Sequence, residues 1–275
     1  MIHYTVYEYF SNNKKKWINS ILALFLFGIV LRYIVYEDFL PAGENLTLYD
    51  YFFSSLSYPF IIILILPLLF CYLTSDIILS DFSDNYINFL TTRVANRASY
   101  FFSKVITMFV ASNVFVISYM SILIILAFIF RLPLTGECYY SPIMLFEHTN
   151  KSIFLLLFIQ YALILIFLIT LGFLFIAISL FFRKSIYNFI IVIILITESH
   201  NSVFNDNSTI MFSPLSQGIF SLHYPFNMAT TLTNYTIIYS IRYLLFISII
   251  LFIISYFRIR SMNLYIKDWY IWIKL

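Results

Sequence analysis

The most regular feature of the chain is a series of long apolar runs separated by short polar segments. A helix needs about 20 apolar residues to cross the hydrocarbon core of a bilayer, and five of the runs reach that length. A sixth run is shorter, but charged residues flank it on both sides, so it must also reach the far side. We therefore predict six membrane-spanning helices. Their ranges are 17–36, 51–73, 105–130, 153–182, 186–200 and 235–257.

The fifth predicted helix differs from the others in length. Its apolar part, 186–197, covers roughly 18 Å at 1.5 Å per residue, whereas the hydrocarbon core is about 30 Å thick. We therefore expect a short or broken span. The segment after it, 201–234, contains no Lys or Arg and is interrupted by Pro214, Gly218 and Pro225. Because these residues break regular helices, we expect an outer re-entrant segment of two short helices that dip into the bilayer.

Composition supports an all-α polytopic membrane protein that forms one transmembrane domain, 1–275. No apolar run alternates with a period of two, as the strands of a membrane β-barrel do. Charged residues make up 11% of the chain and hydrophobic residues 62%, whereas soluble proteins carry about 25% charged residues. The net charge of +3 is too small to indicate a nucleic-acid partner.

Lys and Arg predict the orientation of the helices. Twelve of the 16 basic residues fall in the segments 14–16, 93–104, 183–184 and 258–274, which share one side of a six-helix arrangement. Cytoplasmic segments carry an excess of Lys and Arg, so both termini are expected in the cytoplasm. Ile, Phe, Tyr, Asn and Lys are abundant while Ala and Gly are scarce, which is typical of an AT-rich bacterial genome. We expect a multi-pass protein of the bacterial cell membrane.

Both ends of the chain carry amphipathic patterns. Ile2, Val6, Tyr9 and Phe10 share one helical face, so we expect residues 1–13 to form an elbow helix in the membrane interface. The tail, 258–275, repeats apolar residues at helical spacing. It is either a second interfacial segment or a poorly ordered cytoplasmic tail.

The chain lacks the motifs of the common catalytic sites. Its five glycines are too sparse for a phosphate-binding loop, and the zinc-protease pattern H-E-x-x-H and the nucleophile pattern G-x-S-x-G are missing. We therefore predict that the chain is not an enzyme and holds no cofactor. His200, at the end of the fifth span, and His223, in the outer segment, lie near the acidic residues Glu198 and Asp206 in the sequence, but their spacing resembles no metal site, and we expect them to be solvated.

Three charged residues fall within or at the end of predicted spans. Charges inside a bilayer are expensive, so they are functional candidates by default. Arg32 lies about one turn from the outer end of its span and can reach the surface. Arg242 lies about two turns inside the sixth span, and Glu198 closes the fifth span on the same side. These two could form an ion pair in the bundle interior, or could belong to a transport path.

The segment between the second and third spans is the most informative polar segment. Phe82, Tyr86, Phe89 and Leu90 recur at helical spacing, which predicts an amphipathic helix over 81–90. Asp81 favours its N-terminal end, whereas Arg93 and Arg97 follow its C-terminal end. A short helix with an aromatic face suits docking into a groove of a cytoplasmic partner. The alternative is a helix that lies in the membrane interface.

This segment resembles the permease subunits of type-2 ABC exporters. The resemblance rests on Asp81, the short helix, and the stretch Leu-Thr-Thr-Arg-x-x-x-Arg-x-x-Tyr-Phe-x-Ser-Lys that ends at Lys104. The layout of elbow, six spans and outer segment is also similar. Asp81 stands where a glutamate is usual, and the helix lacks a glycine. The resemblance implies that 81–90 is a coupling helix, docked on a separate cytoplasmic ATPase that binds ATP and Mg.

The resemblance also implies the mechanism. Two copies, or one copy and a homologous permease, would enclose a path lined by the second and fifth spans and opened by alternating access. Phe and Tyr lining suits an amphipathic or hydrophobic cargo, such as a bacteriocin-like peptide or a lipid. One alternative is an ion-coupled secondary transporter that uses Glu198 and Arg242, although the second, third and fourth spans lack ionisable residues. The other is a membrane-embedded enzyme, for which no nucleophile, base or metal set is evident.

Overall fold

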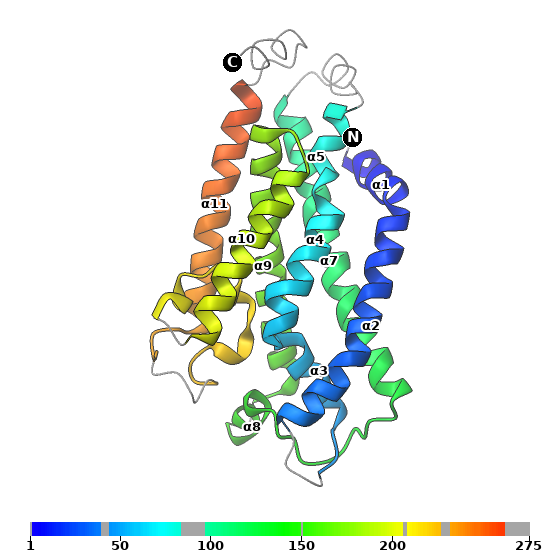
Figure 1. Cartoon of the computed structure of the whole chain (residues 1–275), viewed down its shortest axis with the longest axis vertical. Helices are drawn as coiled ribbons and strands as arrows, with labels where there is room; N and C mark the ends of the chain where they lie inside the picture. The colour runs from blue at the N-terminus through cyan, green and yellow to red at the C-terminus, as the bar shows by residue number, and fades with distance from the viewer. Residues whose placement is uncertain are drawn as a thin grey trace.

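The computed structural model describes residues 2–39, 44–83, 97–149, 151–205, 208–226 and 232–261. Within these ranges the chain is helical and forms no strand, apart from a single parallel bridge between Tyr224 and Thr236. The predicted all-α fold is therefore confirmed. Figure 1 shows a bundle in which the long helices run roughly along the long axis of the molecule.

Six helical segments are long and apolar enough to cross a membrane, as the apolar runs predict. They are α2 (Lys14–Phe39), the continuous stretch Ile61–Phe82, α7 (Arg97–Ile129), α9 (Ile153–Phe182), α10 (Ile186–Phe204) and α11 (Ile237–Ser261). The stretch Ile61–Phe82 comprises the π-helical turn η1 (Ile61–Ile65), α4 (Leu66–Thr74) and most of α5 (Asp76–Ser83). The shorter elements are α1 (Ile2–Asn12), α3 (Leu48–Ser57), α8 (Ser141–His148) and the 3₁₀ turns η2 (Ser208–Met211), η3 (Ser216–Gly218) and η4 (Phe220–Leu222). The chain is a multi-pass membrane protein.

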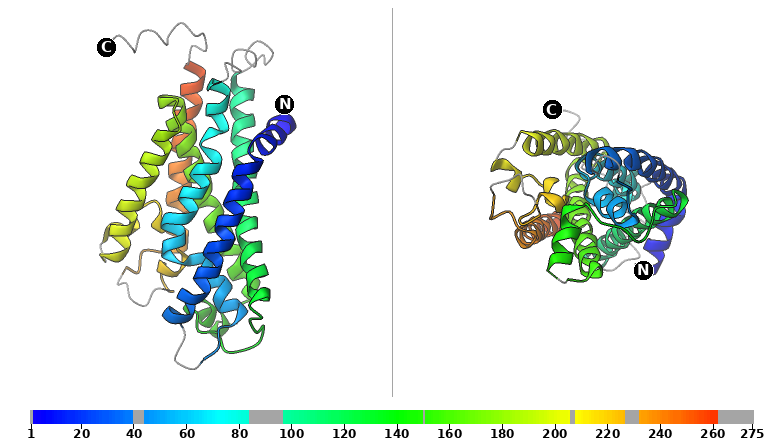
Figure 2. Two further views of the ribbon diagram at one scale, coloured as in Figure 1. Left: turned by 45° about the vertical axis from the view of Figure 1, so that its right-hand side comes forward. Right: turned by 90° about the horizontal axis from the view of Figure 1, so that it is seen from below.

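The second and fourth spans form the centre of the bundle. In the most apolar stretches of Ile61–Phe82 and α9, 72% and 78% of the residues are buried, whereas α10 and α11 reach only 22% and 17%. Phe70 of α4 packs between Phe115 of α7 and Phe175 of α9, with ring centroids 5.8 and 6.2 Å apart. The view along the bundle shows the other helices arranged around this pair (Figure 2). Consequently, α10 and α11 offer most of their apolar surface to the surroundings.

The second predicted span, 51–73, does not form one continuous helix. It is interrupted at Tyr58, whose backbone is extended (ψ 123°) because residue 59 is a proline. The chain resumes through η1, where the backbone N–H of Leu66 donates to the carbonyl of Ile61 five residues earlier. The membrane-crossing part therefore runs from Ile61 to Phe82, and α3 packs as a separate buried helix at the end of the bundle opposite to α1 (Figure 1).

The fifth span and the outer segment also differ from the prediction. α10 is neither broken nor limited to 186–200, because its helix continues through polar residues to Phe204. In the described part of 201–234, residues 208–226 form the three 3₁₀ turns instead of two short α-helices. This stretch packs into the bundle at Gly218, where an added Cβ would lie 2.8 Å from Cγ2 of Ile62 and 3.2 Å from the ring of Phe167. The lack of a side chain at Gly218 therefore lets the outer segment approach the central helices.

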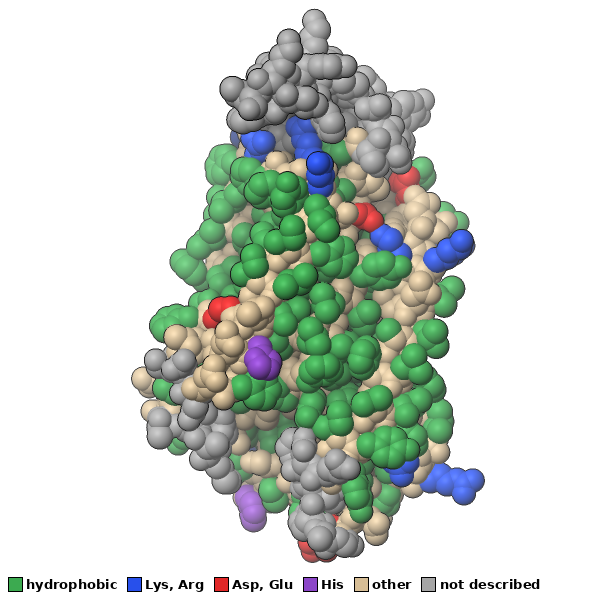
Figure 3. Space-filling model, viewed as in Figure 1, with side chains coloured by type: hydrophobic (Ala, Val, Ile, Leu, Met, Phe, Trp, Pro, Cys, Tyr) green, Lys and Arg blue, Asp and Glu red, His purple; other side chains and the backbone are tan. Residues whose placement is uncertain are grey.

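The basic residues gather at the end of the bundle that holds α1 and the last turn of α11. α1 continues into α2 through the single turn residue Asn13 and bends away from the axis of α2 (Figures 1 and 2). Most Lys and Arg side chains on the face drawn in Figure 3 lie toward this end, and the middle of that face is largely apolar. The positions of the described basic residues agree with the segments that the sequence groups on one side.

Candidate functional site

The candidate site is a cavity of about 770 Å³ at the basic end of the bundle. It lies between α1, α5, α7 and the turn that precedes α10. Acidic and basic side chains both reach it. The charged lining residues are Glu8, Asp76, Asp81, Lys104, Arg183 and Lys184.

The best-defined contact of the cavity is a buried ion pair between α5 and α7. Oδ2 of Asp81 lies 2.7 Å from Nζ of Lys104, and the two side chains are 8% and 10% exposed. The hydroxyl of Tyr100, also on α7, donates to the same carboxylate oxygen at 2.7 Å. Removal of either charge would leave the other buried without its partner, so the cluster fixes α5 against α7.

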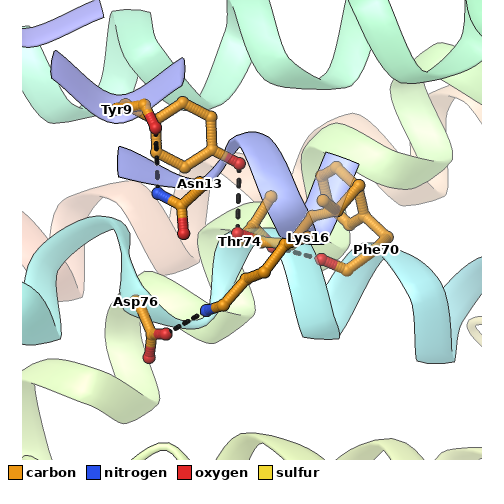
Figure 4. Close-up of polar contacts among 7 residues, drawn as sticks. Tyr9, Asn13, Lys16, Phe70, Thr74 and Asp76 are labelled. Atoms are coloured by element: carbon orange, nitrogen blue, oxygen red, sulfur yellow. Dashed lines mark hydrogen bonds and ion pairs between the residues drawn. The ribbon is translucent and has the colours of Figure 1, made fainter. Parts of the chain in front are cut away.

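A second ion pair attaches α2 to α5 beside the cavity. Nζ of Lys16 contacts a carboxylate oxygen of Asp76, the first residue of α5. Close by, Tyr9 donates through its hydroxyl to the carbonyl of Leu73 at 3.0 Å, and the side-chain amide of Asn13 donates to the carbonyl of Tyr9 at 2.9 Å. Figure 4 shows how these residues join the bend between α1 and α2 to the second span.

Phe82 and the turn after α9 form the far side of the cavity. The guanidinium carbon of Arg183 lies 5.3 Å from the centre of the Phe82 ring, within cation–π range. Arg183 adopts a left-handed backbone (φ 52°) that ends α9. Lys184 and the first residues of α10 follow directly, so the turn contributes two basic side chains to the lining of the cavity.

The predicted docking residues differ in their surroundings. Asp81 does not begin a new helix and is not available to a partner, because it lies inside α5 with its carboxylate engaged by α7. Phe82 is half-buried. Arg97 is exposed and donates through Nη1 to the carbonyl of Arg260 at 2.9 Å, which links the start of α7 to the end of α11. The remaining docking candidates, Tyr86, Phe89, Leu90 and Arg93, lie outside the described residues, as does most of the predicted helix 81–90.

Glu198 and Arg242, which could have formed an ion pair in the bundle interior, do not pair within the chain. Both side chains are exposed on the surface of the chain, and the structure has no ion pair between them. Glu198 instead accepts hydrogen bonds from the hydroxyls of Ser202 (3.1 Å) and Ser199 (3.3 Å) on its own helix. Arg32 lies over the ring of Phe130 at 4.5 Å, which ties it to the C-terminal end of α7.

The outer segment contains a buried polar network that the sequence did not reveal. His223 was expected to be solvated, but it is fully buried, and its Nε2 lies 2.6 Å from Oγ of Ser240 on α11. Ser240 donates to Oε1 of Gln217 at 2.5 Å, and the His223 ring stacks on Tyr235. Burial lowers the pKa of His223 to about 4, so its imidazole is neutral near pH 7. This network ties the outer segment to the start of α11.

Metal-binding geometry is absent from the part of the chain that the structure describes. No three His, Cys, Asp or Glu side chains gather there as ligands.

The fold and the apolar surface define the class of the protein: a multi-pass α-helical membrane protein. Residues 8–265 match the family described as "Protein of unknown function (DUF2705)", so the chain belongs to that family. No curated protein and no solved structure matches the chain.

Proposed function

We propose that the chain is the membrane permease subunit of an ATP-driven exporter of the type-2 ABC class. In this proposal, both termini and the charged cavity face the cytoplasm of a bacterial cell, and α1 is an elbow helix in the membrane interface. Residues 81–90 contain the coupling helix, which docks on a separate ATPase that binds ATP and Mg. Two copies, or this chain and a homologous permease, enclose the path of an amphipathic or hydrophobic cargo.

One observation carries the proposal: the buried cluster of Asp81, Tyr100 and Lys104 joins the two ends of the segment between α5 and α7. A partner that pushed on residues 84–96 would therefore move α5 and α7 together. The Lys16–Asp76 ion pair extends the same connection to α2. ATP hydrolysis can change the state of a permease only if the ATPase binds its two states with different affinity. Through the cluster, a movement of the docked segment would be transmitted directly to α5 and α7.

The cargo path would run along the second and fifth spans. Of these, α10 is largely exposed, whereas α4 is covered by its neighbours and the outer segment contacts η1. A path along α4 therefore requires the outer segment to move away from Ile62. This segment acts as the outer gate in the proposal.

The test is an affinity purification of the tagged chain from its native membranes in mild detergent, with mass spectrometry of the bound proteins. We expect a stoichiometric soluble protein that carries a phosphate-binding loop. Phe82→Asp combined with Phe89→Asp should abolish that association while membrane insertion stays intact. The matched control is Leu134→Asp, which changes an exposed apolar residue at the opposite end of the bundle. A chain that purifies without an ATPase would contradict the proposal and favour the ion-coupled transporter.

A further inference from the structure

Two exposed charges of opposite sign lie at membrane depth on the two least buried helices. Glu198 is twelve residues beyond the start of α10 at Ile186, roughly 18 Å along the helix axis. Arg242 lies sixteen residues before Arg258, the first basic residue at the other end of α11, or roughly 24 Å away. Measured from the basic end of the bundle, both positions fall within a hydrocarbon core about 30 Å thick.

Apolar, exposed residues lie on both sides of Arg242, and on the N-terminal side of Glu198, which the polar residues Ser199, His200 and Asn201 follow. Ile194 lies one turn before Glu198 and is 59% exposed. Ile238 and Leu245 lie one turn to either side of Arg242, and both are exposed. Arg242 therefore sits on a surface that would otherwise face lipid, and Glu198 sits where such a surface ends.

Such an arrangement is unfavourable for an isolated chain. Charged side chains in membrane helices almost always face a protein interior or a water-filled cavity and pair with one another. Glu198 has only serine hydroxyls of its own helix, and Arg242 makes no hydrogen bond or ion pair within the described residues. A covering surface with complementary charges would satisfy both.

We propose that a second copy of this chain covers this surface, and that Glu198 of each copy pairs with Arg242 of the other. In a two-fold dimer the same patch meets itself, so one contact between two different residues is made twice. The opposite signs of the two residues, and their similar depth, provide the complementarity that such a dimer needs. α10 and α11 flank the outer segment, so the interface would lie beside it. The inference rests on the proposed function in one respect, which is that an exporter of this class needs two permease subunits.

The experiment uses charge reversal with two differently tagged copies, co-expressed and captured through one tag. Glu198→Arg alone places two arginines opposite each other, and Arg242→Glu alone places two glutamates opposite each other. We expect each to lower the captured fraction of the second copy at least about tenfold. Co-expression of one Glu198→Arg copy with one Arg242→Glu copy makes both contacts attractive again, and capture should return to the level of the unmodified chain.

This restoration between copies separates the proposal from its alternatives. An ion pair within one chain would be restored only when both changes are in the same copy. Capture that stays unchanged in the single variants would mean that lipid or water satisfies the charges. Either result, or an unmodified chain that captures no second copy, would overturn the proposal.

Folding is monitored separately. Each variant is checked by thermal unfolding in detergent, with Glu198→Gln and Arg242→Gln as uncharged replacements and Lys15→Glu as a matched reversal on α2. The neutral variants should weaken capture less than the reversals, and Lys15→Glu should leave it unchanged. No ATPase takes part in this assay, so failure of the copy–copy interface and failure of ATPase docking give different results.

Discussion

The buried cluster of Asp81, Tyr100 and Lys104 allows a quantitative prediction. Lys104→Met removes the ammonium and leaves the Asp81 carboxylate buried, with the Tyr100 hydroxyl as its main donor. Loss of one partner of a buried ion pair costs about 3–5 kcal/mol. Tyr100→Phe removes one hydrogen bond to a charged group, for which we expect a loss of about 1.5–3 kcal/mol. Equilibrium unfolding in detergent with a denaturant measures both changes in the free energy of unfolding.

A double variant tests the physical reason. Asp81→Leu combined with Lys104→Met removes both charges and keeps similar side-chain volumes, so most of the stability lost in Lys104→Met should return. Lys151→Met, at an exposed lysine, should change the free energy of unfolding by no more than about 0.5 kcal/mol. If Lys104→Met matched this control, or if the double variant were less stable than the single one, the ion pair would not hold α5 against α7.

Three further predictions concern the outer segment and the two cysteines. The free energy of unfolding should fall by up to about 3 kcal/mol as the pH is lowered from 6.5 to 4. In this range the histidine binds a proton in the unfolded chain, whereas buried His223 stays neutral in the folded chain. His223→Gln should flatten this pH dependence. Gly218→Ala should cost about 1–3 kcal/mol through its contact with Ile62, and in combination with Ile62→Ala the two losses should be less than additive, as unfolding measurements can check. On intact cells, a membrane-impermeant maleimide should label half-exposed Cys138 and spare buried Cys71; labelling of Cys138 only after lysis would reverse the proposed orientation.

The sequence predicted the helical class and the number of spans because both depend on local composition. A run of about 20 apolar residues leaves little choice but a membrane helix. The interruption of the second span was also accessible, since Pro59 disfavours helix at Tyr58. The length of α10 was underestimated because a helix continues wherever its backbone is satisfied, even when its side chains become polar at Glu198.

The candidate site was only partly predictable. Asp81 and Lys104 both lie in the polar segment between the second and third spans that resembles the ABC permeases. Their pairing, however, depends on how α5 packs against α7, which no local sequence pattern records. The burial of His223 was missed although apolar residues, Phe220, Leu222 and Phe226, surround it in the sequence, because its partners Gln217 and Ser240 come together only in the fold. At Glu198 and Arg242 the sequence suggested burial in the bundle, but both side chains are exposed. The sequence does not show which face of α10 or α11 packs against the bundle.

The short apolar part of α10 has a consequence for the surrounding lipid. This part, residues 186–197, matches only about 18 Å of a 30 Å hydrocarbon core, while α9 runs over 30 residues without a charged side chain. The bilayer beside α10 must therefore thin, and such hydrophobic mismatch can be relieved by association of helices. Association of two copies over α10 would remove the deformed lipid from the contact. The bilayer itself would then favour the paired state, more strongly in thick membranes than in thin ones.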